Sequence, residues 1–483
     1  MDVSDDPSTL LYVRTAAKIQ CLIDQGLFRP GERLPSIRGL SERLHLGINT
    51  ARQAYIVLEN AHRIEGRPRS GFYVSSTAQR TAGGLTAGGP ATERPGTTGE
   101  RALAPRRSAS QPLLSLGMGS PNPELLPAVK LNRMLAQQGR KFPRQFVAYP
   151  PPNGVQRLRV QIAKRSMDCG CSFSADDVVV TSGCVEAVTL ALRATCRPGD
   201  TVAVESPVYG TFLDAIQSLG LTVLEIPASA DGGINVEVLR FALRENRIRA
   251  CLTISNFNNP LGGMMPAEKK RQVVRLLARF GIPLIEDDAY GDLGFSGRRP
   301  PVFKSFDNDG LVLLCSSFSK TLAPGYRVGW IAAGRYQPRV QELKSLWNVA
   351  TAAPTQLAIA EFLANGGYDR HLRSLRLRTA ETMAKVRSTI EAGFPIGTRI
   401  TKPGGGFVLW VEMPEGFDAR ALHARAQKEG IAIAPGQQFS LNGDFTHCFR
   451  INHSYWSEEI RRGLVRLGEL TRERDRNPMP SCD

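Results

Sequence analysis

The sequence contains no uncharged apolar run of about 18 residues, the length that a membrane-spanning helix requires. Its first residues, Met1–Asp6, are acidic, whereas a secretory signal peptide begins with basic residues. These two absences argue against membrane insertion and against export. We therefore expect a cytoplasmic protein without a membrane partner.

Cysteine is present in a pattern that suits neither a metal site nor a disulfide framework. The chain has nine cysteines, and the pair Cys169 and Cys171 has no second pair and no histidines nearby. Zinc sites and disulfide-rich secreted domains need such clusters. We expect reduced thiols and no bound metal.

Large apolar side chains are almost absent between Ser75 and Gln111, where Ala, Gly, Thr, Pro, Ser and Arg dominate. Such a stretch cannot bury a core. We expect a flexible linker over residues 76–112, which separates an N-terminal domain (1–75) from a larger domain (113–475) and a short tail (476–483). A length of 483 residues agrees with two or three domains.

Acidic residues are fewer than basic ones. Lys and Arg number 61 against 45 Asp and Glu, a formal net charge of +16. Residues 26–75 hold eight arginines and four glutamates, a local net charge of +4. This excess favours a polyanionic partner, although a solvated basic surface explains it as well.

Three helices and two strands are predicted in the N-terminal domain. The first helix follows apolar residues at helical spacing and ends near Gly26; the second begins at Ser36, which is placed to cap it; the third covers about residues 48–60. The apolar positions are Tyr12, Ala16, Ile19 and Ile23, then Ile37, Leu40 and Leu44, then Ala51, Tyr55 and Leu58. Residues Ile64–Val74 predict two short strands around a Pro/Gly turn, that is, a wing.

The segments Pro30–Arg38, Ala54–Tyr55 and Arg67–Tyr73 resemble, in matching order, the winged helix-turn-helix of GntR-type regulators. This resemblance implies binding to double-stranded promoter DNA. The side chains expected at the DNA lie around the third helix and on the wing: Arg38, Asn49, Thr50, Arg52 and Arg69.

The turn before the third helix departs from that family. It usually has Gly-Val-Ser, whereas this chain has His45, Leu46 and Gly47. Histidine tolerates a left-handed backbone better than most residues, and glycine caps a helix start nearly as well as threonine. We expect the fold to survive, and the operator sequence stays open.

Short apolar runs that end in polar residues recur in the larger domain: Val178–Val180, Val202–Val204, Cys251–Ile254, Ile282–Ile285 and Leu311–Cys315. Their spacing leaves room for crossover helices, which predicts an α/β fold with a mostly parallel sheet. Ligands bind beyond the carboxyl ends of the strands in such sheets.

Each run is followed by residues with functional chemistry, although each segment alone has an ordinary structural explanation. After the last run, Lys320 is suited to form a Schiff base with an aldehyde, while Ser317, Ser319 and Arg327 offer donors and charge to a phosphate. Pyridoxal 5'-phosphate carries both groups. A carboxylate in Glu286–Asp288 would keep a pyridine nitrogen protonated.

Residues 113–470 resemble the fold-type I pyridoxal-phosphate enzymes of the aspartate aminotransferase class. The resemblance implies a mostly parallel central sheet, a smaller C-terminal α+β subdomain and a homodimer. It makes Lys320 the Schiff-base lysine and Arg450 the residue that binds a substrate carboxylate. The other implied cofactor contacts are Asp287 at the pyridine nitrogen, Tyr290 and Asn259 at the phenolic oxygen, Tyr209 stacked on the ring, Ser182, Gly183, Cys184, Ser317, Ser319 and Arg327 at the phosphate, and Tyr149 from the second subunit.

A GntR-like module joined to an aminotransferase-like domain resembles the MocR subgroup of bacterial transcription regulators. That resemblance implies a regulator that binds promoter DNA and senses pyridoxal phosphate or an amino compound that forms an aldimine. Two alternatives stay open at this point. The chain is an aminotransferase acting on an amino acid or amine with an accessory DNA-binding module, or the cofactor is purely structural.

Overall fold

The computed structural model describes residues 11–24, 28, 31–44, 46–61, 63–67, 70–75, 114–245 and 247–473. The predicted linker (76–112) and tail (476–483) lie outside these ranges. Three residues singled out from the sequence, Gly26, His45 and Arg69, lie outside them as well.

The N-terminal domain consists of three helices and a two-stranded wing, as the sequence predicts. Its elements are α1 (Leu11–Asp24), α2 (Ile37–Leu44), α3 (Ile48–Asn60), β1 (Ile64–Arg67) and β2 (Gly71–Val74). Ile19, Leu40, Ala54 and Tyr55 are almost fully buried between the helices. The Tyr55 hydroxyl donates to the Pro35 carbonyl at 2.7 Å and so ties α3 to the start of α2.

Both predicted helix starts are found. The Ser36 hydroxyl accepts a hydrogen bond from the Gly39 amide at 3.1 Å at the first turn of α2. Gly47 is the N-cap of α3, with φ −60° and ψ 143°, and α3 begins there without a side-chain cap. The altered turn sequence is therefore compatible with the helix-turn-helix geometry.

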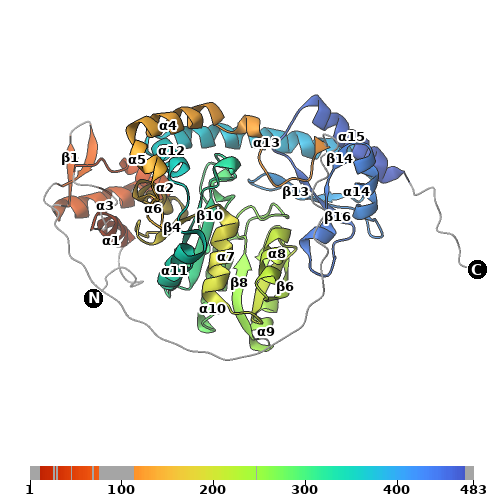
Figure 1. Cartoon of the computed structure of the whole chain (residues 1–483), viewed down its shortest axis with the longest axis horizontal. Helices are drawn as coiled ribbons and strands as arrows, with labels where there is room; N and C mark the ends of the chain where they lie inside the picture. The colour runs from red at the N-terminus through yellow and green to blue at the C-terminus, as the bar shows by residue number, and fades with distance from the viewer. Residues whose placement is uncertain are drawn as a thin grey trace, which may run out of the picture.

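The larger domain is built on an eight-stranded sheet with the order β4-β11-β10-β9-β8-β5-β6-β7 (Figure 1). Within this sheet, β11 and β7 run in the direction opposite to that of the other six strands. The predicted, mostly parallel sheet is therefore confirmed. The strands are β4 (Val178–Thr181), β5 (Thr201–Ser206), β6 (Thr222–Ser229), β7 (Gly233–Ile234), β8 (Ile248–Thr253), β9 (Leu284–Asp287), β10 (Val312–Ser317) and β11 (Gly329–Ala332).

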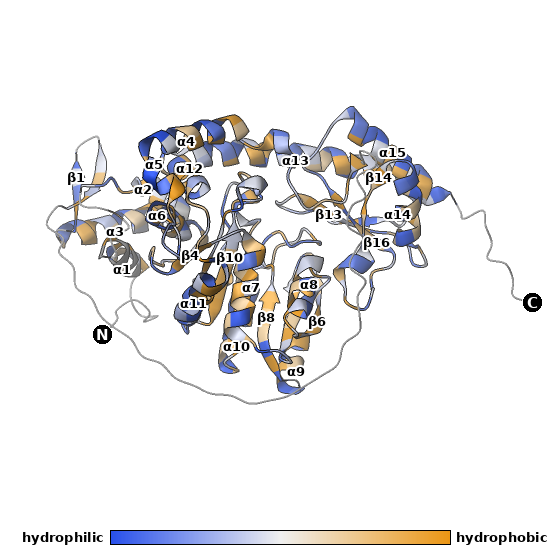
Figure 2. Cartoon of the chain, viewed as in Figure 1, coloured by the Kyte–Doolittle hydropathy of each residue, from blue (hydrophilic) through white to orange (hydrophobic). Residues whose placement is uncertain are grey.

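The sheet is buried on both faces. Ala203 and Cys251 belong to one hydrophobic cluster, whereas the next residues along the same strands, Val204 and Leu252, belong to another. Side chains alternate between the faces of a strand, so both faces must be covered by helices. Figure 2 shows β8 as hydrophobic and the surrounding helices as mixed. The helices that follow the strands are α7 (Cys184–Thr195), α8 (Gly210–Ser218), α9 (Val236–Glu245), α10 (Ala267–Arg279) and α11 (Gln337–Asn348).

A smaller α+β subdomain completes the C-terminal part, as expected. It contains the four-stranded sheet β12-β13-β16-β15 and the long helix α13 (Gly367–Gly393). The bounds of its other elements are β12 (Arg399–Ile400), β13 (Val408–Glu412), α14 (Ala419–Lys428), β14 (Ile431–Ala432), β15 (Ala434–Pro435), β16 (Cys448–Asn452) and α15 (Glu458–Arg472). The first described strand of the larger domain, β3 (Leu114–Ser115), pairs with β14.

The N-terminal domain packs on the larger domain beside α6 (Gln156–Ser166) and the 3-10 turn η2 (Met167–Cys169) (Figure 1). Lys164 of α6 forms an ion pair with Glu32, and its Nζ lies 5.1 Å from the centroid of the Phe28 ring. Nearby helices are α4 (Ala128–Lys141), α5 (Pro143–Val147) and α12 (Ala353–Ala364). Among the described residues, no helix is long and apolar enough to cross a membrane.

Candidate functional site

Polar residues from several strands meet at the carboxyl edge of the large sheet. Asp287 is the last residue of β9, and Lys320 follows the end of β10 by three residues. Ser182, Tyr209 and Asn259 follow β4, β5 and β8. Because these strands run in the same direction, their ends lie at one edge of the sheet. The strands that carry these residues are not all consecutive in the sequence, because β6 and β7 lie between β5 and β8 along the chain.

Lys320 and Tyr290 share one backbone acceptor. The Lys320 Nζ donates to the Gly119 carbonyl at 2.6 Å, and the Tyr290 hydroxyl donates to the same oxygen at 2.9 Å. Burial lowers the pKa of Lys320 and raises that of Tyr290. A lowered lysine pKa increases the share of neutral amine, which is the form that attacks a carbonyl carbon.

Asp287 is a buried carboxylate, only 6% exposed. It accepts hydrogen bonds from the Cys184 thiol at 3.0 Å and from the Ala289 amide at 2.9 Å. Burial raises the pKa of Asp287 to about 6, and the nearby charge of Lys320 offsets this only in part. A protonated ring nitrogen beside this carboxylate would stabilise its charged form.

The N-terminus of α7 and Arg327 form a cradle for an anion. Gly183 is the N-cap of α7, with φ +103° and no side-chain cap. Arg327, itself in a left-handed conformation at φ 51°, donates from Nη2 to the Ser182 carbonyl at 2.7 Å. The positive end of the α7 dipole and the exposed Arg327 guanidinium both favour an anion at this turn, in addition to Glu186 in the first turn of the helix.

Glycine is required in this cradle. A Cβ atom on Gly183 would lie 2.5 Å from the Arg327 Nη2. Together with the buried Asp287 and the half-buried Lys320, the cradle fits the phosphate, ring nitrogen and aldehyde of pyridoxal phosphate. The predicted Ser317 is 6% exposed and its hydroxyl accepts from the Ser319 amide at 3.4 Å, while Ser319 is half-buried.

Arg450 lies on β16 of the small subdomain. It is 7% exposed and donates from Nη1 to the Asn259 Oδ1 at 2.6 Å and from Nη2 to the Gly117 carbonyl at 2.5 Å. Its Nε has no hydrogen-bond partner, and no carboxylate within the described ranges pairs with it. A buried guanidinium with a spare donor suits a ligand carboxylate.

The segment Leu116–Ser120 was missed from the sequence. Its Gly117 and Gly119 carbonyls accept from Arg450, Tyr290 and Lys320, and the Asn452 side chain donates to Ser120 at 2.6 Å. A Cβ atom on Gly119 would lie 3.4 to 3.5 Å from the side chains of Asn259, Arg450 and Tyr290. The two glycines spaced by one residue, just after the short strand β3, were the available signal.

A second set of missed residues lies behind the cradle. The Asn348 Nδ2 donates to the Ser182 hydroxyl at 3.2 Å and to Glu186 at 2.9 Å. The buried Lys344 donates to the same Glu186 oxygen at 2.8 Å. The Glu186 carboxylate in turn accepts from the Ser182 amide. These contacts hold the turn at the start of α7.

The two tyrosines expected at the cofactor ring, Tyr209 and Tyr149, differ in their burial. Tyr209 is half-buried and its ring meets that of Phe212 edge to face, with 5.3 Å between the centroids. Burial lowers the pKa of Lys320, and the nearby Tyr209 opposes this lowering only in part. Tyr149 is 87% exposed, so within one chain it does not join the buried cluster.

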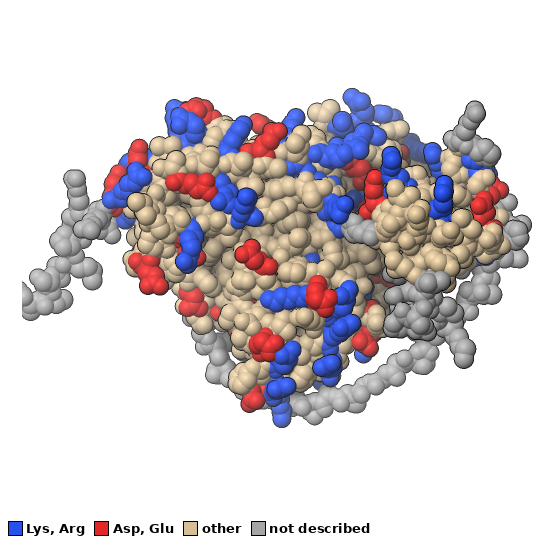
Figure 3. All heavy atoms as spheres, turned by 180° about the vertical axis from the view of Figure 1, so that it is seen from behind, with Lys and Arg blue, Asp and Glu red and all other residues tan. Residues whose placement is uncertain are grey.

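The candidate DNA contacts lie on one part of the N-terminal domain. Arg38 on α2 and Asn49 and Arg52 at the start of α3 are exposed, whereas Thr50 is half-buried. Elsewhere, Figure 3 shows basic and acidic side chains interspersed on the rear face of the molecule, so that face carries no field of a single sign.

The chain matches two protein-family models. Residues 112–467 match "Aminotransferase class I and II", and residues 11–74 match "Bacterial regulatory proteins, gntR family". The uncharacterized HTH-type transcriptional regulator YjiR of Escherichia coli strain K12 is 38% identical over 95% of this chain and 98% of its own length.

Aminotransferases match the larger domain. Aromatic-amino-acid aminotransferase 1 of Thermococcus litoralis is 30% identical over 75% of this chain and 88% of its own length. The α-aminoadipate aminotransferase LysN of Thermus thermophilus, solved with N-(5'-phosphopyridoxyl)-L-leucine, has a TM-score of 0.70 at 27% identity and covers 75% of this chain and 92% of its own. The aminotransferase fold thus implies a pyridoxal-phosphate site.

Asp287→Asn should change how stability depends on pH. The pKa of Asp287 is raised from 3.8 to about 6, so wild-type cofactor-free protein loses stability as pH rises from about 4 to 6. The variant lacks this titration, so its stability relative to wild type should increase by up to about 3 kcal/mol as the pH rises through that window. The difference between the melting temperatures of the two proteins should change in the same direction. Thermal melts at several pH values measure it. A difference between the two proteins that does not change with pH contradicts the assignment.

Gly183→Ala should weaken pyridoxal-phosphate binding roughly tenfold or more, because its Cβ would displace the Arg327 guanidinium and because φ +103° is strained for alanine. Absorbance titration with the cofactor measures the affinity. Gly393→Ala is the matched control, since a Cβ there meets no atom within 4 Å. Equal affinities for the two variants would rule out the cradle as the phosphate site.

Proposed function

The chain belongs to the MocR type of regulatory proteins, in which a GntR-family winged helix-turn-helix domain precedes an aminotransferase class I and II domain, and on this basis we propose that it regulates transcription in response to pyridoxal phosphate or an amino compound. The observation that supports this proposal is that one chain holds both exposed polar residues on the helix-turn-helix and the half-buried Lys320 near the buried Asp287. The DNA partner would be a promoter duplex.

In this proposal Lys320, Asp287 and the cradle of Gly183 and Arg327 hold the cofactor. When bound, pyridoxal phosphate supplies an aldehyde carbon that reacts with primary amines and a ring that withdraws electrons. Tyr290 and Asn259 would donate to the ring oxygen, and Tyr209 would cover the ring. Arg450 would orient a ligand carboxylate through the Nη hydrogens that Asn259 and Gly117 leave free, so an amino acid is the effector class that the residues favour.

Coupling between the domains would run through α6. Lys164 contacts Glu32 and Phe28 of the DNA-binding domain. The next residue, Arg165, pairs with Asp369 at 2.8 Å and lies over the Tyr368 ring at 4.5 Å. The Tyr368 hydroxyl contacts Thr321 Oγ1 at 3.0 Å, directly beside Lys320.

A change at Lys320 therefore has a short packed route to the surface that holds the DNA-binding domain. A ligand alters this contact only if it binds one arrangement of the domains better than the other. A coupling of about 1 to 3 kcal/mol would change DNA affinity roughly 5- to 150-fold.

We also propose that the functional unit is a homodimer. Tyr149 is expected to reach the cofactor site of a second subunit, and it is 87% exposed in the single chain. Val147 and Trp347 are exposed to 89% and 64%. Apolar side chains that are this exposed favour an interface in which a second protein surface covers them.

An aminotransferase with an accessory DNA-binding domain is the second candidate, because the residues expected to hold the cofactor are present and named aminotransferases match the domain. A regulator and an aminotransferase differ in how many amino groups each site transfers. Incubation with pyridoxal phosphate, candidate amino acids and a keto acid should give a single half-reaction for a sensor. Many turnovers per site, without specific DNA binding, would support the enzyme instead.

Arg52→Gln should weaken binding to the chain's own upstream DNA roughly tenfold, since Arg52 is exposed at the start of α3, where side chains enter a major groove. Fluorescence anisotropy at fixed salt measures the effect. Arg420→Gln removes an exposed arginine from α14 and should leave affinity unchanged. An equal loss in both variants would mean that net charge alone drives binding.

Lys164→Ala should retain cofactor and DNA binding but lose most of the cofactor-dependent change in DNA affinity, because it removes the ion pair with Glu32 and the contact with Phe28. DNA titrations with and without pyridoxal phosphate test this. Lys428→Ala, an exposed lysine of α14, is the control. An undiminished cofactor effect in Lys164→Ala would exclude α6 as the route.

A further inference from the structure

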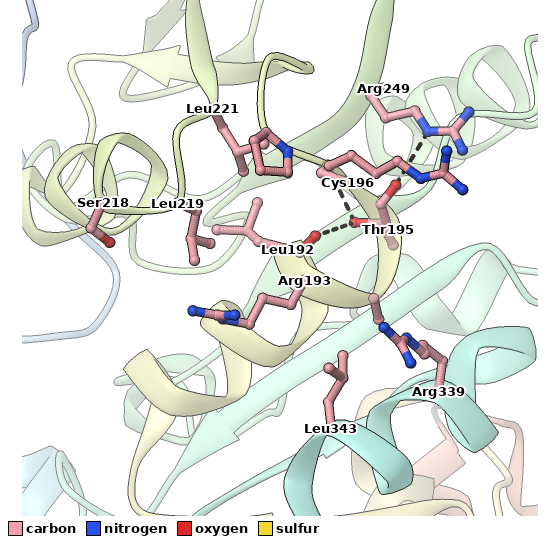
Figure 4. Close-up of a pocket in the computed structure, with 13 residues that line it drawn as sticks. Leu192, Arg193, Thr195, Cys196, Ser218, Leu219, Leu221, Arg249, Arg339 and Leu343 are labelled. Carbon is pink, nitrogen blue, oxygen red and sulfur yellow. Dashed lines mark hydrogen bonds between the residues drawn. The ribbon is translucent and has the colours of Figure 1, made fainter. Parts of the chain in front are cut away.

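A second cavity lies at the opposite edge of the large sheet from Lys320. It has a volume of about 940 Å³, within the range of small-molecule sites. It is bordered by the end of α7, the turn that leads into β5, the end of α8, the start of β8 and one side of α11 (Figure 4). These are the amino ends of β5 and β8, whereas Lys320 and Asp287 follow carboxyl ends. The cavity is therefore separate from the cofactor site.

Leucine side chains form an apolar floor in this cleft. Leu192, Leu221 and Leu343 are buried, and Leu219 is half-buried. Four arginines lie around the leucines: Arg193, Arg197, Arg249 and Arg339. An apolar floor with cationic groups at its margin suits a ligand that has an apolar body and an anionic group.

The arginines are only partly neutralised. The Arg249 Nε lies 3.9 Å from Asp200, and Arg339 pairs with Glu342 at 2.7 Å, both at exposed positions where an ion pair contributes little. No carboxylate in the described part of the chain pairs with Arg193 or Arg197. The four guanidinium groups and two carboxylates leave a net charge of +2.

Helix capping explains why some of the four arginines lie at this cleft. The Arg249 Nε donates to the Thr195 carbonyl at 3.3 Å, shown as a dashed line in Figure 4, and so satisfies the last turn of α7. Arg193 lies in the same turn, where a cation is favourable, and its Cζ is 3.9 Å from the centroid of the Trp347 ring. Capping does not account for Arg197, nor for the leucine floor beneath the arginines.

We propose that this cleft binds a small organic phosphate with an apolar or aromatic body. A phosphate monoester carries close to two negative charges at neutral pH, which matches the excess of two guanidinium groups. The planar fork of arginine binds phosphate oxygens through two parallel hydrogen bonds. A DNA backbone would engage the arginines but offers no apolar group to the leucine floor, so the cleft favours a small molecule.

The test uses 1-naphthyl phosphate as the probe and inorganic phosphate as the anion without an apolar body. Full-length protein is loaded with pyridoxal phosphate and freed of excess by gel filtration, and binding is measured by calorimetry. The variant is Arg193→Gln combined with Arg197→Gln. The control is Arg244→Gln combined with Arg247→Gln, which removes two exposed arginines outside the cleft. Thermal melts verify that both variants fold.

The expected result is saturable binding of 1-naphthyl phosphate that is at least tenfold tighter than that of inorganic phosphate. It should weaken about tenfold or more in the cleft variant and less than twofold in the control. Equal binding by wild type and the cleft variant would overturn the proposal, as would equal affinity for inorganic phosphate. If random-sequence duplex DNA displaces the probe and the cleft variant loses non-specific DNA affinity, the cleft is a contact for the DNA backbone and the proposal is wrong. None of these outcomes depends on whether the chain regulates transcription.

Discussion

The pairing of β9 with β10 is the constraint on which the site depends. In their parallel register Asp287 lies opposite Cys315, and Lys320 follows only a few residues later. Burial of both groups raises the pKa of Asp287 to about 6 and lowers that of Lys320. A buried acid and a half-buried lysine whose pKa values are both perturbed are typical of functional sites. The anion cradle and Arg450 are arranged around this pair.

Local sequence patterns were sufficient for the elements that carry most of the chemistry. Three helices with period-3.6 apolar residues and five apolar runs with polar ends predict the winged helix and the carboxyl edge of the sheet. The strand β6 was missed because it is half-buried, carries Glu225 and contains Pro227, so it lacks a continuous apolar run. The short β7 and the antiparallel β11 were missed as well.

Contacts between distant segments were beyond local patterns. Lys320 donates a hydrogen bond to the Gly119 carbonyl, which is 201 residues away in the sequence, and Arg450 donates one to the Gly117 carbonyl, which is 333 residues away. The contact between Lys164 and Glu32 joins two domains, and neither residue has a local signal. Tyr149 remains a prediction, because its expected partner lies in a second subunit.

Two helices link distant parts of this molecule. The helix α6 carries Lys164 toward the DNA-binding domain and Arg165 toward Tyr368 and Thr321, beside Lys320. The helix α7 begins at the anion cradle and ends at the arginine-lined cleft, about 18 Å away at 1.5 Å per residue. Rigid elements of this kind transmit a displacement at one end to the other.

Control of DNA binding through Lys320 is tested by measuring promoter-DNA affinity at fixed salt as pyridoxal phosphate is added, for wild type and for Lys320→Ala. We expect the cofactor to change the affinity of wild type at least roughly fivefold and to leave that of Lys320→Ala unchanged. A DNA affinity of wild type that is indifferent to the cofactor, or a response that persists in Lys320→Ala, would contradict a regulator controlled through this lysine.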